Sequence, residues 1–283
     1  RGKLDAALEE LQALGDVGEG EVEVDLLRSS IQLFRGRWEK VASVLGEVDG
    51  NELSGASREE YRALSSMLAF YESSKSWSGK GFRVFAPEGL EGASVMVREI
   101  SEVFERWKEE VAGLETNSSC FSILLTESQA NFSDWENLRK PGRVVVLQLE
   151  EDLKRRVADV LIRSSGKTST YSSLLLQGLT EFLARERIYS DAAAIIEDGS
   201  WTPLEGAFFR ANRAGPVELE AAGFVKYVLE RYGAEEFSKI WHMTTPLGGD
   251  NSLELALREV LGKGLSDVEA ELIRLLEEND KSE

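Results

Sequence analysis

The chain has 283 residues, with 33 Lys and Arg against 51 Asp and Glu, and only one His and one Cys. A Cys/His zinc site needs three or four such ligands, and an HExxH zinc motif needs two histidines, so neither can form. One cysteine excludes an internal disulfide. A Ser–His or Cys–His catalytic pair would have to use His242, the sole histidine. The composition therefore excludes most of the common catalytic sites for hydrolysis.

The remaining composition predicts a folded chain with a sizeable core. It is 42% hydrophobic and 30% charged, and its length suits one large domain or two. No run of about 18 apolar residues occurs, so no membrane span is expected. The net charge of −18 opposes binding to nucleic acid, which depends on Lys and Arg at phosphates. Because the chain begins at Arg1, we expect further residues upstream in the full-length protein.

The N-terminal part carries an internal repeat. Residues 1–11 (RGKLDAALEEL) align with residues 35–45 (RGRWEKVASVL) at an offset of 34 residues. This period, with a glycine before each second helix, resembles the tetratricopeptide repeat, which implies helical hairpins with concave binding surfaces. Trp38, at the fourth position of its copy, is expected to dock on the preceding helix. The second copy departs from the family at Val41, where a small residue is usual.

Two further helices are predicted around this repeat. Residues 21–34 place Leu27, Ile31 and Phe34 on one face. Residues 57–74 form an amphipathic helix. Its apolar stripe consists of Tyr61, Leu64, Met67, Leu68 and Tyr71.

Residues 76–80 (SWSGK) are expected to form a domain boundary, because the pattern then changes to strands alternating with helices. We therefore divide the chain into a helical-repeat segment at 1–78 and a second domain at 79–283. The predicted strands are 81–86, 121–125 and 144–149, and the predicted helices are 93–114, 151–164, 170–187, 217–232, 234–242, 252–262 and 265–278. A small mixed sheet with many helices is an α+β fold that is mostly α.

Three segments of the second domain resemble gluzincin (peptidase MA-like) metallopeptidases. Residues 174–182 (LLLQGLTEF) are similar to the family's Glu-Gly-Leu-Ala-Glu helix, and residues 224–233 (FVKYVLERYG) to the helix after its active site. Residues 255–259 (LALRE), followed by Gly262, match the usual ending. The resemblance implies a zincin-like fold over about 200 residues.

The same resemblance implies that the zinc site has been lost. The family's zinc-binding glutamate corresponds to Gln177, and the HExxH helix would fall at residues 153–161 (LKRRVADVL), which lack both histidines and the general base. Without ligands to hold and acidify a water, the family's chemistry does not transfer. We expect a degenerate cleft with Gln177, Glu181, Arg155 and Arg156, no catalytic residues, no metal and no cofactor.

Other suggestive residues have plainer explanations. Glu181 is expected to form a structural ion pair with Arg155 or Arg156. His242 is expected near a helix end, where it can interact with the helix dipole. Cys120 is expected to be a small buried hydrophobe. The segment Gly166–Thr168 lacks the strand and first glycine of a phosphate-binding loop, so a polar loop is expected. Trp201, Trp241, Phe208 and Phe209 are expected in the core rather than in a retained apolar cleft.

Three functional hypotheses remain open. The favoured one is a non-catalytic interaction protein that binds a protein or peptide partner. The second is a hydrolase that uses a carboxylate such as Glu181 without metal, and the third is a purely structural α+β module. The resemblance and the acidic charge favour a location of the protein in the cell envelope or outside the cell. The sequence gives no indication of oligomeric state.

Overall fold

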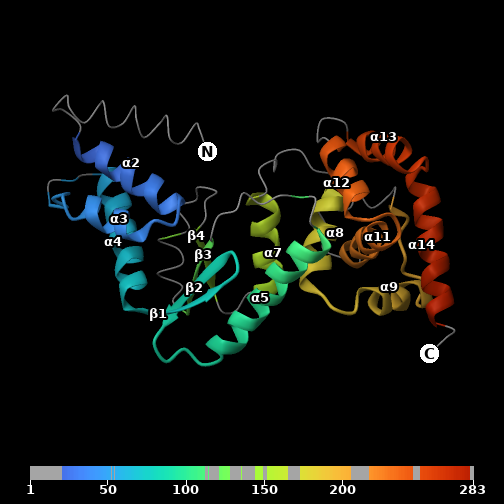
Figure 1. The fold of residues 1–283 in the computed structure, drawn as a ribbon, viewed down its shortest axis with the longest axis horizontal. Coiled ribbons are helices and arrows are strands. Elements are labelled where there is room, and N and C mark those ends of the chain that lie inside the picture. Colours follow the sequence, from blue (N-terminus) through green and yellow to red (C-terminus); the bar gives the residue numbers. More distant parts are fainter. Residues whose placement is uncertain are drawn as a thin grey trace. The chain divides into compact units, whose positions relative to one another are not determined.

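The chain folds mainly into helices with one small sheet (Figure 1). The structure, a computed structural model, describes residues 21–51, 53, 55–111, 114, 121–127, 135, 144–148, 152–164, 173–204, 217–244 and 249–280. Within these residues the elements are α2 (Glu21–Phe34), α3 (Trp38–Leu45), α4 (Gly55–Ser73), β1 (Ser74–Gly79), β2 (Phe82–Pro87), α5 (Ala93–Glu110), β3 (Phe121–Thr126), β4 (Val144–Gln148), α7 (Leu153–Ser164), α8 (Ser173–Ala184), α9 (Ile188–Glu197), α11 (Val217–Tyr232), α12 (Ala234–Met243), α13 (Gly249–Leu261) and α14 (Leu265–Asp280). The predicted α+β class with a helical majority is confirmed.

Two compact units share the chain, and neither is one continuous segment. Unit 1 comprises residues 1–97 and 118–151, and unit 2 comprises residues 98–117 and 152–283. The first division falls inside α5, so this helix begins in unit 1 and continues in unit 2.

The first described helices of unit 1 form a hairpin that turns at Gly36. Its φ of +66° lies in the left-handed region, which residues with a Cβ rarely adopt. Trp38, at the start of α3, is 2% exposed and stacks on Tyr71 of α4 with ring centroids 4.5 Å apart. The indole Nε1–H donates to the Ser122 hydroxyl of β3 at 3.1 Å. One side chain therefore ties α3, α4 and the sheet together.

The buried face of α2 differs from the predicted one. The sequence predicts a face with Leu27 and Ile31, but Leu26 and Leu33 are buried and Leu27 is 40% exposed. The helix carries two adjacent apolar rows with helical spacing. The buried row includes Ser29, whose small side chain is fully buried. The side chain of Phe34 lies outside the described part.

The predicted stripe of α4 is confirmed. Leu64 and Met67 are buried in the unit 1 core. Tyr61, Leu68 and Tyr71 are partly buried against the same core cluster, which also contains Phe85 and Leu124 of the sheet.

The sheet has the strand order β1-β2-β3-β4. Strand β1 is antiparallel to β2, whereas β2–β3 and β3–β4 are parallel, so the predicted mixed sheet is confirmed. Every residue of β3 is buried, which explains its nearly continuous apolar sequence. The three predicted strands are present, and each end differs from the prediction by at most one residue.

Strand β1 is missing from the sequence prediction. Residues 76–80 are predicted to form a boundary, yet Ser74–Gly79 pair with Phe82–Pro87. Ser, Lys and Gly have low strand propensity, so pairing with the apolar β2 decides the conformation. The ring of Phe82 covers its partner Gly79 so closely that a Cβ at residue 79 would lie 2.2 Å from the Phe82 Cζ.

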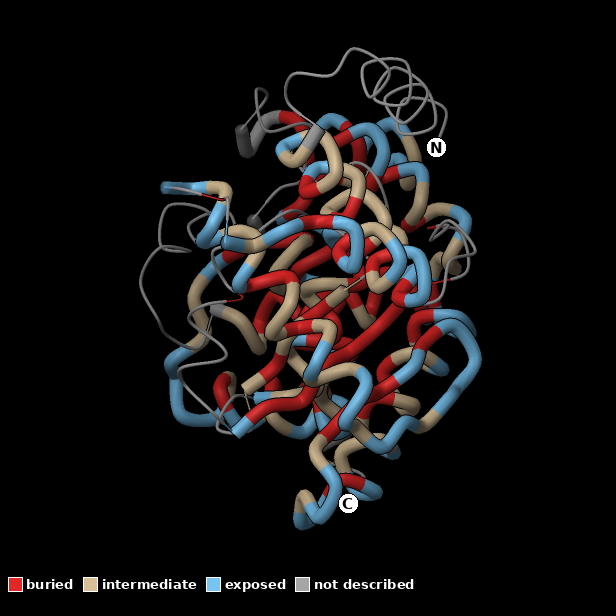
Figure 2. Tube along the Cα trace, turned by 90° about the vertical axis from the view of Figure 1, so that its left-hand side faces the viewer, coloured by how far each residue is buried: buried red, intermediate tan, exposed pale blue. Residues whose placement is uncertain are grey.

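Unit 2 is helical, and α8 lies at its centre. Five apolar residues of α8 are 2% exposed or less: Leu174, Leu175, Leu179, Phe182 and Leu183. A helix buried on most of its sides is typical of a domain core. Helices α7 and α11 pack on α8, and α9 and α14 pack on α11. Buried positions are red in Figure 2.

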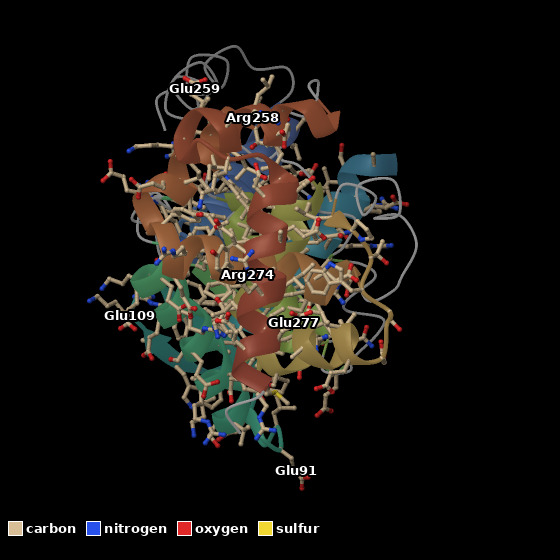
Figure 3. All side chains as sticks on the ribbon, turned by 90° about the vertical axis from the view of Figure 1, so that its right-hand side faces the viewer. Glu91, Glu109, Arg258, Glu259, Arg274 and Glu277 are labelled. Carbon is tan, nitrogen blue, oxygen red and sulfur yellow. The ribbon has the colours of Figure 1, made fainter. Side chains whose placement is uncertain are left out.

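The predicted helices of unit 2 are present with shifted ends, and the prediction lacks one of the helices that the structure describes there. Helix α9 buries Ile188, Ala192 and Ile195, which have helical spacing. Gly233 follows α11 and Gly262 follows α13, and both have a positive φ. Charged side chains such as Glu109, Arg258 and Glu277 point into solvent, as Figure 3 shows.

Some predictions concern residues outside the described part: the first repeat copy at 1–11, Cys120, the segment Gly166–Thr168, and Phe208 and Phe209. Among the described helices, none is both long enough and apolar enough to cross a bilayer.

Candidate functional site

The residues singled out by the gluzincin resemblance lie on α7 and α8, two helices that pack on each other. Gln177 and Glu181 are one turn apart on α8 and therefore share a face. Arg155 and Arg156 lie in the first turn of α7. Arg156 is exposed, whereas the side chain of Arg155 reaches α8. The structure thus joins Arg155 to Glu181 and confirms the predicted ion pair.

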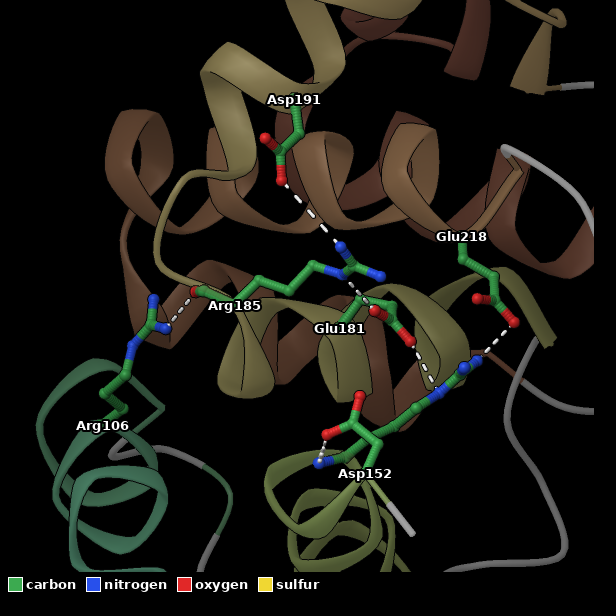
Figure 4. Close-up of polar contacts among 7 residues, drawn as sticks. Arg106, Asp152, Glu181, Arg185, Asp191 and Glu218 are labelled. Atoms are coloured by element: carbon green, nitrogen blue, oxygen red, sulfur yellow. Dashed lines mark hydrogen bonds and ion pairs between the residues drawn. The ribbon is translucent and has the colours of Figure 1, made fainter. Parts of the chain in front are cut away.

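Glu181 is a buried carboxylate held between two guanidinium groups (Figure 4). Its side chain is 1% exposed. Oε2 accepts a hydrogen bond from the Nε–H of Arg185 at 2.6 Å. Oε1 lies 2.7 Å from Nε of Arg155 without hydrogen-bond alignment, so this second contact is an ion pair. The two arginine side chains are 39% and 41% exposed, so they bring the positive charge to Glu181 from the surface.

Each arginine also contacts a second acidic residue. Arg155 donates to the carboxylate of Glu218 in α11, and Arg185 lies 3.9 Å from the carboxylate of Asp191 in α9. Arg106 of α5 donates to the backbone carbonyl of Arg185. The network therefore connects α5, α7, α8, α9 and α11.

The electrostatics of the network favour the charged state of both arginines. Partial burial lowers the pKa of Arg155, but its hydrogen bond to Glu218 and the charge of Glu181 outweigh this, so the pKa is raised. The hydrogen bond to Glu181 raises the pKa of Arg185. Both arginines therefore stay cationic beside the buried carboxylate of Glu181.

The α8–α11 crossing explains why glycine stands beside Gln177. A Cβ on Gly178 would lie 2.4 Å from the carbonyl oxygen of Ala221 and 2.8 Å from Cγ2 of Val225. Any larger residue would force the helices apart. The glycine of the motif therefore has a packing role in this chain.

Sequence reasoning did not find Arg185, Glu218, Asp191 or Arg106. Arg185 follows Glu181 by four residues, the spacing of a helical ion pair, so the sequence contained a signal for it. Glu218 and Asp191 are brought in by tertiary packing and have no comparable local signal.

The donors around α7 and α8 do not fit the zinc ion that the resemblance implies. Arg155 places a cation against Glu181, and Asp159, the one acidic residue between Leu153 and Ser164, is paired with Arg163 at 2.8 Å. Among all described residues, no group of three or more His, Cys, Asp or Glu could hold a metal ion.

Two other buried carboxylates, Glu269 and Glu220, hold the segment after α9. Glu269 of α14 accepts hydrogen bonds from the indole N–H of Trp201 at 2.9 Å and from the backbone N–H of Leu204 at 2.8 Å. Glu220 of α11 accepts one from the backbone N–H of Thr202 at 2.6 Å. These carboxylates satisfy backbone donors, so their role is structural.

A third polar cluster links α11 to α14. Both Tyr227 and Tyr232 donate to Oε2 of Glu271, at 3.0 and 2.9 Å, and the ammonium of Lys263 lies 2.6 Å from Oε1. Lys263 lowers the pKa of Glu271. Burial, followed by the hydrogen bond to Glu271, raises the pKa of Tyr227 to about 12.

The remaining candidates lie apart from these clusters. His242 is exposed in the last turn of α12, and Trp241 is fully buried in the core, as predicted. Trp201 is partly buried and bonded to Glu269.

No protein-family model matches the sequence, and a search of the curated proteins finds no significant match.

Proposed function

We propose that this chain is a non-catalytic interaction protein that binds a protein or peptide partner on a degenerate metallopeptidase-like scaffold. In this proposal residues 1–78 are tetratricopeptide-like hairpins and residues 79–283 are a zincin-like domain without its metal. Support for the second part comes from the order of β2, α5, β3, β4 and α7, which matches the order expected from the resemblance.

The observation that carries the proposal is the state of Glu181. A general base must be free to accept a proton in its working cycle. Guanidinium groups contact both carboxylate oxygens of Glu181, at 2.6 and 2.7 Å. The carboxylate is therefore engaged in structural contacts, and its full burial keeps it from a substrate. These facts count against the hydrolase alternative at this residue.

A defined random-sequence peptide library tests the proposal. The purified chain is incubated with the library, bound peptides are recovered, and both bound and free fractions are analysed by mass spectrometry. We expect saturable retention of a subset of peptides without cleavage products. Elemental analysis of the same protein is expected to find much less than one zinc per chain.

The other outcomes separate the alternatives. Cleavage products that disappear in Glu181→Gln would favour the metal-free hydrolase, and stoichiometric zinc would contradict a degenerate site. If the library is neither retained nor cleaved, the hypothesis of a purely structural module remains. Asp159→Asn is the matched control, because it removes one carboxylate from the exposed Asp159–Arg163 pair of the adjacent helix.

A further inference from the structure

The β1–β2 hairpin is a basic segment in an acidic chain. Residues 74–87 contain Lys75, Lys80 and Arg83 and no acidic residue, whereas the whole chain has a net charge of −18. All three cationic side chains are exposed. The hairpin therefore carries a local positive charge, although the net charge of the chain is negative.

These cations are not neutralised by the described part of the chain. Lys75 lies 5.4 Å from the ring centroid of Trp77, its neighbour on the same strand face. None of the three forms an ion pair with a described carboxylate. Several exposed cations of unit 2 differ from them, since Arg163, Lys239 and Arg258 each pair with an acidic residue four positions earlier.

The strand that carries Lys75 is an edge of the sheet (Figure 1). Among the described residues, β1 pairs with β2 alone. In an antiparallel pair every second residue directs its N–H and C=O groups to the neighbouring strand, and the residues between direct theirs outward. A six-residue strand thus offers main-chain donors and acceptors along its outer edge. Three of its residues are serines, which add little bulk at this edge.

We propose that the outer edge of β1 binds an extended acidic peptide, which adds a strand to the sheet. Main-chain hydrogen bonds to Ser74–Gly79 supply the pairing, and acidic side chains on one face of the peptide lie on the face of Lys75. Lys80, in the turn, and Arg83, which pairs with Ser78 and so lies on the other face, add to the positive potential at this edge. This inference rests on the proposed interaction function and gives it a surface and a partner chemistry.

A peptide fits this surface better than a nucleic acid. A strand edge offers hydrogen bonds in the pattern of another peptide backbone, which a nucleic acid lacks. A long polyanion would also meet the repulsion of the −18 charge on the rest of the chain, whereas a short acidic peptide extends little beyond the basic hairpin.

Fluorescence anisotropy with a labelled octapeptide of alternating Glu and Val tests the proposal. The variant carries Lys75→Glu, Lys80→Glu and Arg83→Glu. Because exposed charge pairs contribute modestly, we expect the three reversals to weaken binding by about tenfold. Hydrogen exchange should also slow in residues 74–79 when the peptide is bound to the unaltered chain.

The matched control reverses Arg37, Lys40 and Arg62 to Glu. These residues also belong to unit 1, are exposed, and form no ion pair with a described carboxylate. Both variants change the net charge from −18 to −24, since each of three reversals changes it by −2. The control is expected to bind the peptide with nearly unchanged affinity.

An octapeptide of alternating Glu and Pro tests the strand pairing on the unaltered chain. It has the same charge, but proline removes main-chain donors and fixes a non-strand φ, so we expect no binding. Equal binding of this peptide, equal weakening in both triple variants, no binding of the Glu/Val peptide, or its displacement by oligodeoxythymidine would each overturn the proposal. If library peptides are retained equally by the hairpin variant, the interaction function stands while this site is rejected.

Discussion

Arg155 and Glu181 form an ion pair whose two partners differ in burial: the carboxylate is 1% exposed and the guanidinium 39%. Glu181 loses its hydration on folding, whereas Arg155 keeps part of its own. The cost of burying the carboxylate is offset by two cations, because Arg185 contacts its other oxygen. The pair is therefore a structural element of unit 2.

Glu181→Gln should destabilise unit 2 by about 2–4 kcal/mol, because it leaves Arg155 and Arg185 without their shared charge. Chemical denaturation followed by circular dichroism measures the change. Asp159→Asn, which breaks a largely exposed pair, should cost at most about 0.5 kcal/mol. Equal effects of the two substitutions would contradict the structural role of Glu181.

Gly178→Ala should cost about 2 kcal/mol, although alanine favours helix by about 1 kcal/mol. The new methyl would meet the Ala221 carbonyl at 2.4 Å, and a backbone group cannot move aside cheaply. Gly223→Ala in α11 is the control. Its Cβ would lie 3.5 Å from the Ala192 Cβ, an ordinary contact, so we expect no loss or a gain of about 0.5–1 kcal/mol in thermal or chemical unfolding.

Ser122→Ala should cost about 1–3 kcal/mol, because it removes the acceptor for the buried indole N–H of Trp38. In a Trp38→Phe background the same substitution should cost less than about 0.5 kcal/mol, since no donor is left unsatisfied. A double-mutant cycle on unfolding free energies measures this difference. Additive losses would show that the hydrogen bond contributes nothing.

The stability of the chain should fall as the pH rises from about 10 to about 12. The pKa of Tyr227 is raised from 10.0 to about 12, so over this interval the unfolded chain loses the proton that the folded chain keeps. Unfolding then releases a proton, and stability decreases with rising pH. Tyr227→Phe should flatten this dependence in unfolding measurements at several alkaline pH values. An unchanged slope in the variant would contradict the assignment.

The helices were predictable where apolar residues recur at helical spacing in one row. The stripe of α4 at Leu64 and Met67 is such a case. Helix α2 has two such rows, and only packing against α3 and α4 selects Leu26 over Leu27. Strand β1 has the composition of a loop and forms because β2 pairs with it, which no local pattern could indicate.

The candidate site was predictable only where helical spacing or the resemblance indicated its residues. The contact between Arg155 and Glu181 follows from the packing of two helices that the resemblance places together. Arg185 could have been added from its spacing to Glu181. Glu218 could not, because its position depends on the approach of α11 to α8 at Gly178.

The chain passes between its two units at residues 97–98, 117–118 and 151–152. One backbone cut therefore cannot release either unit as an intact fragment. Limited proteolysis at residues 117–118 or 151–152 should yield nicked species whose pieces stay associated until denaturant is added. Residues 98–117 leave and return as an insertion, so the folding of unit 1 must bring together two segments that are separated in synthesis by part of unit 2.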